Sequence, residues 1–134
     1  MDIKEICRTK YPIMLIHGIG HTDTESPDYW MRIPDALRLR GARVFFGGQD
    51  SFGSIKENGI QIAEKIIELT ENGSADNLNL IAHSKGGLDA RYAVSMCGIS
   101  AKTVTLTTIA TPHRGIRSID IAPKIGRASC RERV

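Results

Sequence analysis

The ten residues LNLIAHSKGG (78–87) lead from an apolar run into a serine that has a small residue two places away on each side. An apolar run followed by such a serine predicts a buried strand, a tight turn and then a helix. Strand and helix approach each other closely at such a turn, so Ala82 and Gly86 have to be small. Ser84 would then lie at the apex of the turn with its hydroxyl group free.

A free hydroxyl group at this position suits a nucleophile. The N-terminus of a helix has unpaired N–H groups and partial positive charge, and both stabilise an oxyanion that forms nearby. The alternative is an ordinary N-cap, because a serine also commonly begins a helix that follows a strand. The pattern Ala82-x-Ser84-x-Gly86 alone leaves both interpretations open, and glycine is the commoner residue at its first position.

Strands and helices are expected to alternate along the chain. Apolar and β-branched runs predict the strands, and helical spacing of apolar residues predicts the helices. The alternation predicts an α/β fold with a parallel sheet and helices on both faces. We expect the strand order second, first, third, fourth, which places the loops after the first and third strands side by side. The expected strands are 12–16, 42–46, 78–83 and 103–109, and the expected helices are 28–40, 54–70 and 85–97.

The helix expected over residues 54–70 carries isoleucines around much of its circumference. Its buried stripe is expected to run through Ile60, Ala63, Ile67 and Thr70, with Ile62, Ile66 and Leu69 widening it.

The first expected strand runs directly into the loop His17-Gly18-Ile19-Gly20. Glycines permit a turn at the carboxyl end of a strand, where open α/β sheets bind ligands. A dinucleotide-binding fingerprint would need a third glycine at position 23, but that residue is Asp23. We therefore expect no cofactor, and we expect this loop to lie beside the loop that carries Ser84.

The composition indicates one soluble globular unit. Of 134 residues, 41% are hydrophobic and 25% charged, and the apolar runs are too short for a signal peptide or a membrane span. We therefore expect a cytoplasmic protein, and its three cysteines, without metal-type or paired spacing, fit reduced thiols there. Two of the net +3 charges lie in residues 125–134, so no nucleic-acid-binding surface is expected.

Residues 125–134 differ abruptly from what precedes them. They show neither helical nor strand periodicity, and their back-translation resembles the read-through of a common sequencing adapter. We expect part of a natural domain over residues 1–124 and a non-native tail over residues 125–134. A basic C-terminal arm is the structural alternative.

Five ordered stretches of the chain resemble the N-terminal half of bacterial triacylglycerol lipases of the α/β-hydrolase superfamily. Together they span nearly all of residues 11–115, in the order found in that family. They are Tyr11 to Gly20, Tyr29-Trp30 with residues 33–37, residues 41–44, Leu80 to Tyr92, and Thr107 to Gly115. Five matches in order indicate the family more strongly than they indicate a particular substrate.

The resemblance implies roles for both loops. Ser84 would be the nucleophile, and the backbone N–H groups of Ile19 and Lys85 would form the oxyanion hole. The family more often has Leu or Met at the first of these two positions and Gln or His at the second, which matters little for backbone donors. We expect the Lys85 side chain to point to solvent. The motif residues that support the site would be His17, Gly18, Ala82, His83 and Gly86.

The four histidines are not expected to include the general base. His17 should make structural hydrogen bonds in its loop, and the side chain of His83 should diverge from that of its neighbour Ser84. We expect His21 to be exposed, and His113 matches a family element other than the catalytic histidine. No metal site is expected, because ligand spacing and supporting Cys or acidic partners are absent.

The resemblance implies that the catalytic acid and histidine lie beyond residue 124, since the order in this fold is serine, acid, histidine. Asp89 and Asp120 are poor candidates for the acid, because neither follows a further strand. Any lid or calcium site would also lie beyond this point. The chain would then be an inactive fragment of a serine ester hydrolase.

Three functions remain open at the level of the sequence. The first is a lipase-like hydrolase of acylglycerol-type esters that makes transient contact with a lipid surface. The second is an esterase or acyltransferase acting on non-lipid esters, and the third is a non-catalytic binding module that kept the fold. Ser84 with both small flanking residues, together with the His17-Gly18 loop, favours an enzyme. The sequence gives no indication of the oligomeric state.

Overall fold

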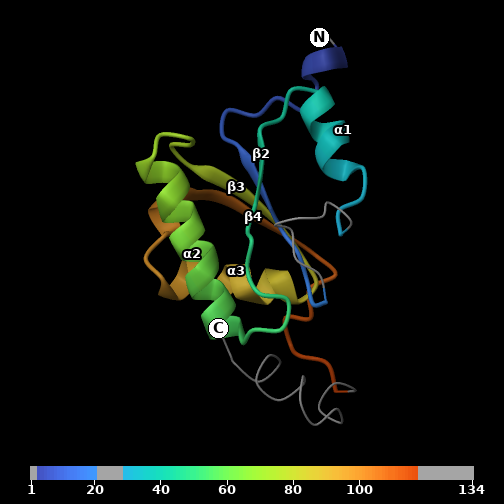
Figure 1. Ribbon diagram of the computed structural model, residues 1–134. Helices are drawn as coiled ribbons and strands as arrows, with labels where there is room; N and C mark the ends of the chain where they lie inside the picture. Colours follow the sequence, from blue (N-terminus) through green and yellow to red (C-terminus); the bar gives the residue numbers. More distant parts are fainter. Residues whose placement is uncertain (1–2, 21–28, 118–134) are drawn as a thin grey trace.

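A computed structural model describes residues 3–20 and 29–117 of the chain. Figure 1 shows the elements in order: the short 3-10 helix η1 (Ile3–Glu5), β1 (Ile13–Ile16), α1 (Ile33–Leu39), β2 (Val44–Phe46), α2 (Ile55–Glu71), β3 (Leu78–His83), α3 (Lys85–Met96), η2 (Ser100–Lys102) and β4 (Thr103–Ile109). The expectations for His21, Asp28, Asp120 and the tail 125–134 fall outside the described residues.

The four strands form one parallel sheet in the order β2-β1-β3-β4, which confirms the predicted order. β1 lies in the interior of the sheet, where Leu15 pairs with Phe46 on one side and with Ile81 on the other. All four of its residues are buried, as expected for a continuous apolar run in a strand covered on both faces. The loops after β1 and β3 therefore emerge side by side.

Helices cover both faces of the sheet, as the alternation predicted (Figure 1). On one face, α1 and the preceding Trp30 pack over the apolar side chains of β1 and β2. On the other face, α2 and α3 bury the larger core cluster, which includes Met14, Ile62 and Leu80. The core is thus divided by the sheet into two apolar layers.

The bounds of the elements follow local signals in the sequence. Ser54 and Glu57 form a reciprocal capping box at the start of α2, and Asn72 with Gly73 (φ 80°) ends that helix. The expected helix 28–40 is shorter than predicted, because the helix begins at Ile33. Met31 has a left-handed φ of 51°, which an α-helix does not accommodate.

The predicted stripe of α2 was only partly right, since Ile62, Ala63, Ile66 and Leu69 are buried as expected and the other three residues are not. The buried side of the helix runs through Ile55, Asn58, Gly59, Ile62, Ala63, Ile66 and Leu69. Ile60 is 40% exposed, and Ile67 and Thr70 are only half-buried. The side that faces inward is set by α3, against which Gly59 packs so closely that an added Cβ would lie 2.7 Å from Cδ1 of Tyr92.

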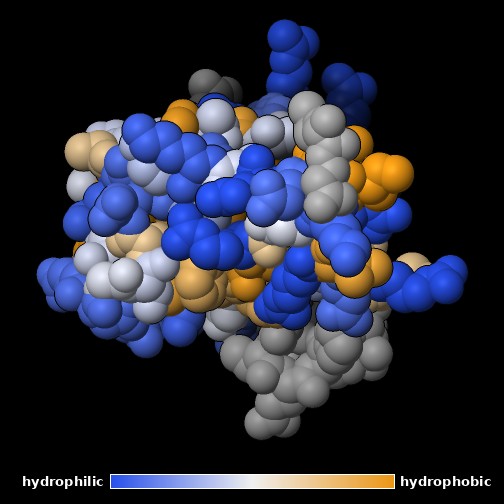
Figure 2. Space-filling model, turned by 90° about the horizontal axis from the view of Figure 1, so that it is seen from above, coloured by the Kyte–Doolittle hydropathy of each residue, from blue (hydrophilic) through white to orange (hydrophobic). Residues whose placement is uncertain are grey.

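The surface is mixed in character. The face seen in Figure 2 is largely hydrophilic, with small groups of hydrophobic residues among the polar ones. No helix within residues 3–20 and 29–117 is both long and apolar enough to cross a membrane. Cys7 and Cys97 are free thiols packed at the edges of the two core clusters.

Candidate active site

Ser84 lies at the turn between β3 and α3 in strained backbone. Its φ of 55° and ψ of −130° are rare for a residue with a side chain. It stands at the N-cap position of α3, yet its hydroxyl group makes no capping hydrogen bond to the helix. Its backbone N–H donates to the carbonyl of Ile109 at 2.9 Å. An ordinary N-cap serine has extended backbone and a side chain bonded to the helix, and Ser84 shows neither feature.

The small residues around Ser84 are required by close contacts. A Cβ on Gly86 would lie 2.1 Å from the carbonyl oxygen of His17, and Ala82 is completely buried beneath the turn. A Cβ on Gly18 would lie 2.9 Å from Cβ of Ser84. The loop after β1 and the turn after β3 therefore lie in direct contact at one end of the sheet.

The two backbone N–H groups predicted to bind an oxyanion belong to these two adjoining segments. Ile16 pairs with Ala82 in the sheet, so Ile19 and Lys85 each lie three residues beyond a paired position. Among the backbone hydrogen bonds of the described turns, loops and caps, neither of these N–H groups is a donor.

His17 anchors the first loop through buried hydrogen bonds. Its Nε2 lies 2.9 Å from the carbonyl oxygen of Gln49, while Nε2 of Gln49 donates to the carbonyl oxygen of His17 at 2.8 Å. Both side chains are almost completely buried. The predicted structural hydrogen bonding of His17 is confirmed, and Gln49 is a partner that the sequence analysis did not identify.

The other two described histidines have hydrogen-bond partners of their own. His83 is hydrogen-bonded through Nδ1 to the phenol of Tyr29, and the rings of Tyr29 and Trp30 pack edge to face beside it. His113 contacts Arg91 through Nδ1 at 2.9 Å and the Thr108 hydroxyl through Nε2 at 3.1 Å. That the His83 side chain diverges from the Ser84 side chain stays a prediction.

The expectation that Lys85 points to solvent was wrong. Its side chain is buried, and Nζ donates to Oδ1 of Asp89 at 2.7 Å. Oδ2 of Asp89 accepts from Nδ2 of Asn58 on α2 at 3.0 Å. The side chain turns inward because position 85 lies on the side of α3 that packs against α2. The i, i+4 spacing of Lys85 and Asp89 was a signal for this pair, and Asn58 among buried apolar positions was a second one.

Burial dominates the electrostatics of this pair. Desolvation raises the pKa of Asp89 to about 6, although Lys85 and the hydrogen bond from Asn58 both oppose the rise. Within residues 3–20 and 29–117, no group of three or more His, Cys, Asp or Glu side chains could hold a metal ion.

Comparison with known proteins identifies relatives with lipase and esterase names. A family model described as "Putative serine esterase (DUF676)" matches residues 41–123. A triacylglycerol lipase of Pseudarthrobacter phenanthrenivorans is 33% identical over 122 residues, which are 87% of this chain and 38% of that protein. Triacylglycerol lipase 2 of Saccharomyces cerevisiae is 35% identical over 107 residues, 75% of this chain and 32% of that protein. The chain spans about a third of the length of these curated relatives.

Solved structures of lipases and esterases share the fold. The mature form of Bacillus licheniformis lipase BlEst2 matches with a TM-score of 0.72 and 24% identity over 84% of this chain and 45% of that one. The metagenomic carboxyl esterase MGS0156 matches with a TM-score of 0.62 and 19% identity over 90% of this chain and 34% of that one. The sheet and its helices are thus part of an α/β-hydrolase fold. Because the family model covers more than half of the residues, the chain belongs to the serine esterase family that this model describes.

Proposed function

We propose that the full-length protein is a serine ester hydrolase whose nucleophile is Ser84. The observation that carries the proposal is the strained Ser84 backbone, with the hydroxyl group left out of the helix cap and the Gly18 loop in contact with it. An N-cap or a packing serine would have no need of this strain, which costs on the order of 1–3 kcal/mol.

The chemistry follows from this arrangement. The Ser84 oxygen attacks the ester carbonyl carbon while a general base takes the hydroxyl proton, and the N–H groups of Ile19 and Lys85 stabilise the resulting oxyanion. Collapse of the tetrahedral intermediate transfers that proton to the leaving alcohol and forms an acyl-enzyme on Ser84. Water then releases the acid by the same steps in reverse.

The general base is proposed to come from the remainder of the protein. The three described histidines take part in other hydrogen bonds: His17 with Gln49, His83 with Tyr29 and His113 with Arg91. Several curated relatives are named triacylglycerol lipases, which supports acylglycerol-type esters as substrates and transient contact with a lipid surface. Esterase or acyltransferase activity on non-lipid esters is the second candidate, favoured by the carboxyl esterase MGS0156 among the structural matches.

Ester hydrolysis by the full-length protein tests the proposal. We expect turnover of p-nitrophenyl butyrate, p-nitrophenyl palmitate or emulsified triolein, and a loss on the order of 10⁴-fold or more in kcat with Ser84→Ala. Ser95→Ala, an exposed serine on the same helix, is the matched control and should retain wild-type kcat. Preference for triolein and palmitate would support the lipase, and preference for butyrate the second candidate. Turnover that survives Ser84→Ala would reject the nucleophile.

A further inference from the structure

Behind Ser84 lies a buried polar network that the proposed chemistry does not use. Lys85 provides the peptide N–H that follows the nucleophile, while its side chain runs into the interior to meet Asp89 one helical turn later. The side chains of these two residues are 6% and 2% exposed. The residue whose N–H group is proposed to bind the oxyanion is therefore held in place by its own side chain.

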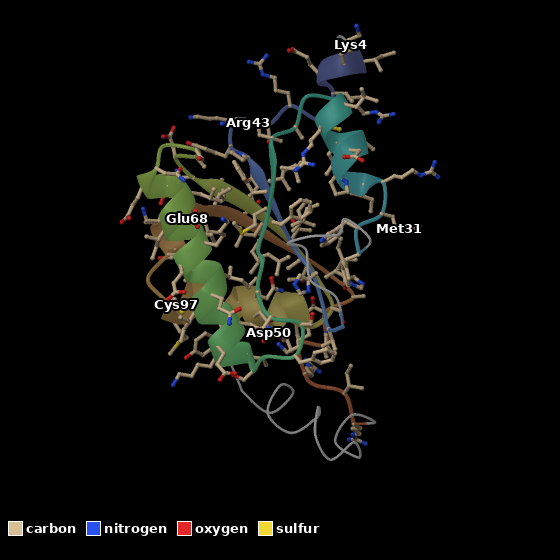
Figure 3. All side chains as sticks on the ribbon, viewed as in Figure 1. Lys4, Met31, Arg43, Asp50, Glu68 and Cys97 are labelled. Atoms are coloured by element: carbon tan, nitrogen blue, oxygen red, sulfur yellow. The ribbon has the colours of Figure 1, made fainter. Side chains whose placement is uncertain are left out.

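The network continues to α2 and to the loop after β2. Nδ2 of Asn58 donates both to Oδ2 of Asp89, at 3.0 Å, and to the backbone carbonyl of Asp50, at 2.7 Å. Figure 3 shows Asp50 at the end of the sheet where β2 leads into α2. The preceding residue is Gln49, which exchanges two hydrogen bonds with His17 in the other oxyanion loop. Residues 49–50 thus connect both loops that carry the proposed donors.

Stability alone accounts poorly for a buried ion pair in this position. Desolvation offsets most of the attraction between two buried charges, and an apolar pair of similar volume is often as stable or more stable. Hydrogen bonds, however, fix direction as well as distance, and oxyanion donors have to be held within a fraction of an ångström of their working positions.

We propose that Lys85, Asp89 and Asn58 are positioning residues, an inference that rests on the proposed function. Their hydrogen bonds hold the Lys85 peptide N–H in register with the Ile19 N–H on the other loop. None of the three side chains touches the ester in this account, so each acts through the backbone of the oxyanion hole. Their loss should weaken binding of the transition state and leave binding of the substrate almost unchanged.

The test replaces the ion pair by an apolar pair in the full-length protein, as Lys85→Met with Asp89→Leu. We expect an unchanged melting temperature and KM, and a fall of about 10- to 100-fold in kcat per titrated active site. The inhibition constant of a trifluoromethyl ketone should rise by the same factor, because its adduct with serine carries an oxyanion. The matched control is the exposed pair Lys65 and Glu68 on α2, where Gln at both positions should change none of these values.

A second variant keeps the test decisive if the double variant does not fold. Asn58→Ala leaves the ion pair in place and removes its connection to α2, and it should lower kcat and inhibitor affinity together by several-fold. Wild-type kcat and inhibitor affinity in a folded variant of either kind would overturn the positioning role. Ser84→Ala, measured in parallel, distinguishes this failure from failure of the proposed function, because only the latter predicts turnover without Ser84.

Discussion

At the scale of single residues, Gly86 is the most constrained position next to the proposed nucleophile. A Cβ there would meet the backbone carbonyl of His17 at 2.1 Å, and a backbone atom cannot move aside as a flexible side chain can. Helix propensity argues in the opposite direction, because Gly→Ala inside a helix usually adds about 1 kcal/mol of stability. The close contact outweighs this gain.

We therefore expect Gly86→Ala to lower the free energy of unfolding by about 1–3 kcal/mol and to lower esterase activity. Urea unfolding of the full-length protein measures the first effect. Ser95→Ala, at an exposed position of the same helix, should change stability by less than about 0.5 kcal/mol. A stabilised Gly86→Ala variant would show that α3 and the carbonyl group of His17 lie further apart than described.

Asp89 gives a prediction for the dependence of stability on pH. Its pKa rises from 3.8 to about 6 on folding, chiefly through desolvation, so the folded state binds the proton more tightly than the unfolded state. The stabilisation from this carboxyl group is thus fully present below pH 3.8 and is lost as pH rises through 6. The two pKa values limit the loss to about 3 kcal/mol.

The measurement compares unfolding of the wild type and of Asp89→Asn, which cannot titrate, between pH 4 and pH 7.5. We expect the wild type to lose stability relative to the variant as pH rises across this range. A relative gain with rising pH would mean that the attraction of Lys85 exceeds the desolvation of the carboxyl group.

The sequence could predict the residues of the turn but not the partners behind it. Ala82, Ser84 and Gly86 are recognised because strand, turn and helix are consecutive in the sequence, although the carbonyl that Gly86 leaves room for belongs to His17 on another loop. The inward direction of Lys85 depends on Asn58, which the fold brings close from a different helix. Within α3 itself, the sign of this arrangement is the i, i+4 spacing of Lys85 and Asp89.

At the scale of elements, the isoleucines of α2 differ in how much they contribute to the hydrophobic core. Ile62 is completely buried between the sheet and the helices, whereas Ile60 is 40% exposed. Ile62→Ala should therefore lower the free energy of unfolding by about 2–5 kcal/mol, and Ile60→Ala by less than about 1 kcal/mol. Thermal unfolding of the two variants checks this difference. Equal losses of stability would mean that Ile60 contributes to the core as the stripe expected from the sequence implied.

The bounds of α2 were predictable from the sequence, and its buried side was predictable only in part. Ser54, Glu57 and the Asn72-Gly73 pair are local signals for the ends of a helix. With isoleucines around much of the helix, periodicity fits more than one stripe, and the packing against α3 selects among them. The start of α1 was missed because the left-handed Met31 has no marker in the sequence.

At the scale of the whole molecule, the alternation of strands and helices was enough to predict that the sheet is parallel. Right-handed crossovers leave few arrangements for four parallel strands, and the observed order β2-β1-β3-β4 places the loops after β1 and β3 together. The general base of the site could not be assigned to the described residues in the same way.

This leads to a prediction for the 134-residue chain expressed as written. It should hydrolyse p-nitrophenyl esters on the order of 10⁶-fold more slowly than the full-length protein, since a serine without its base is a weak nucleophile. Poor solubility should accompany this, because β4 leaves Val104 and Ile109 about half exposed at the edge of the sheet. Folding is checked by circular dichroism. Strong Ser84-dependent turnover by this chain would make one of its own histidines the base.

The central claim is that Ser84 is the nucleophile, and covalent trapping tests it most directly. The full-length protein is inactivated with a fluorophosphonate, digested and sequenced by mass spectrometry. The account predicts one phosphonyl group per molecule, attached to Ser84, and no labelling of the folded Ser84→Ala variant. Complete inactivation with the group on another residue, and with Ser84 unmodified, would contradict it.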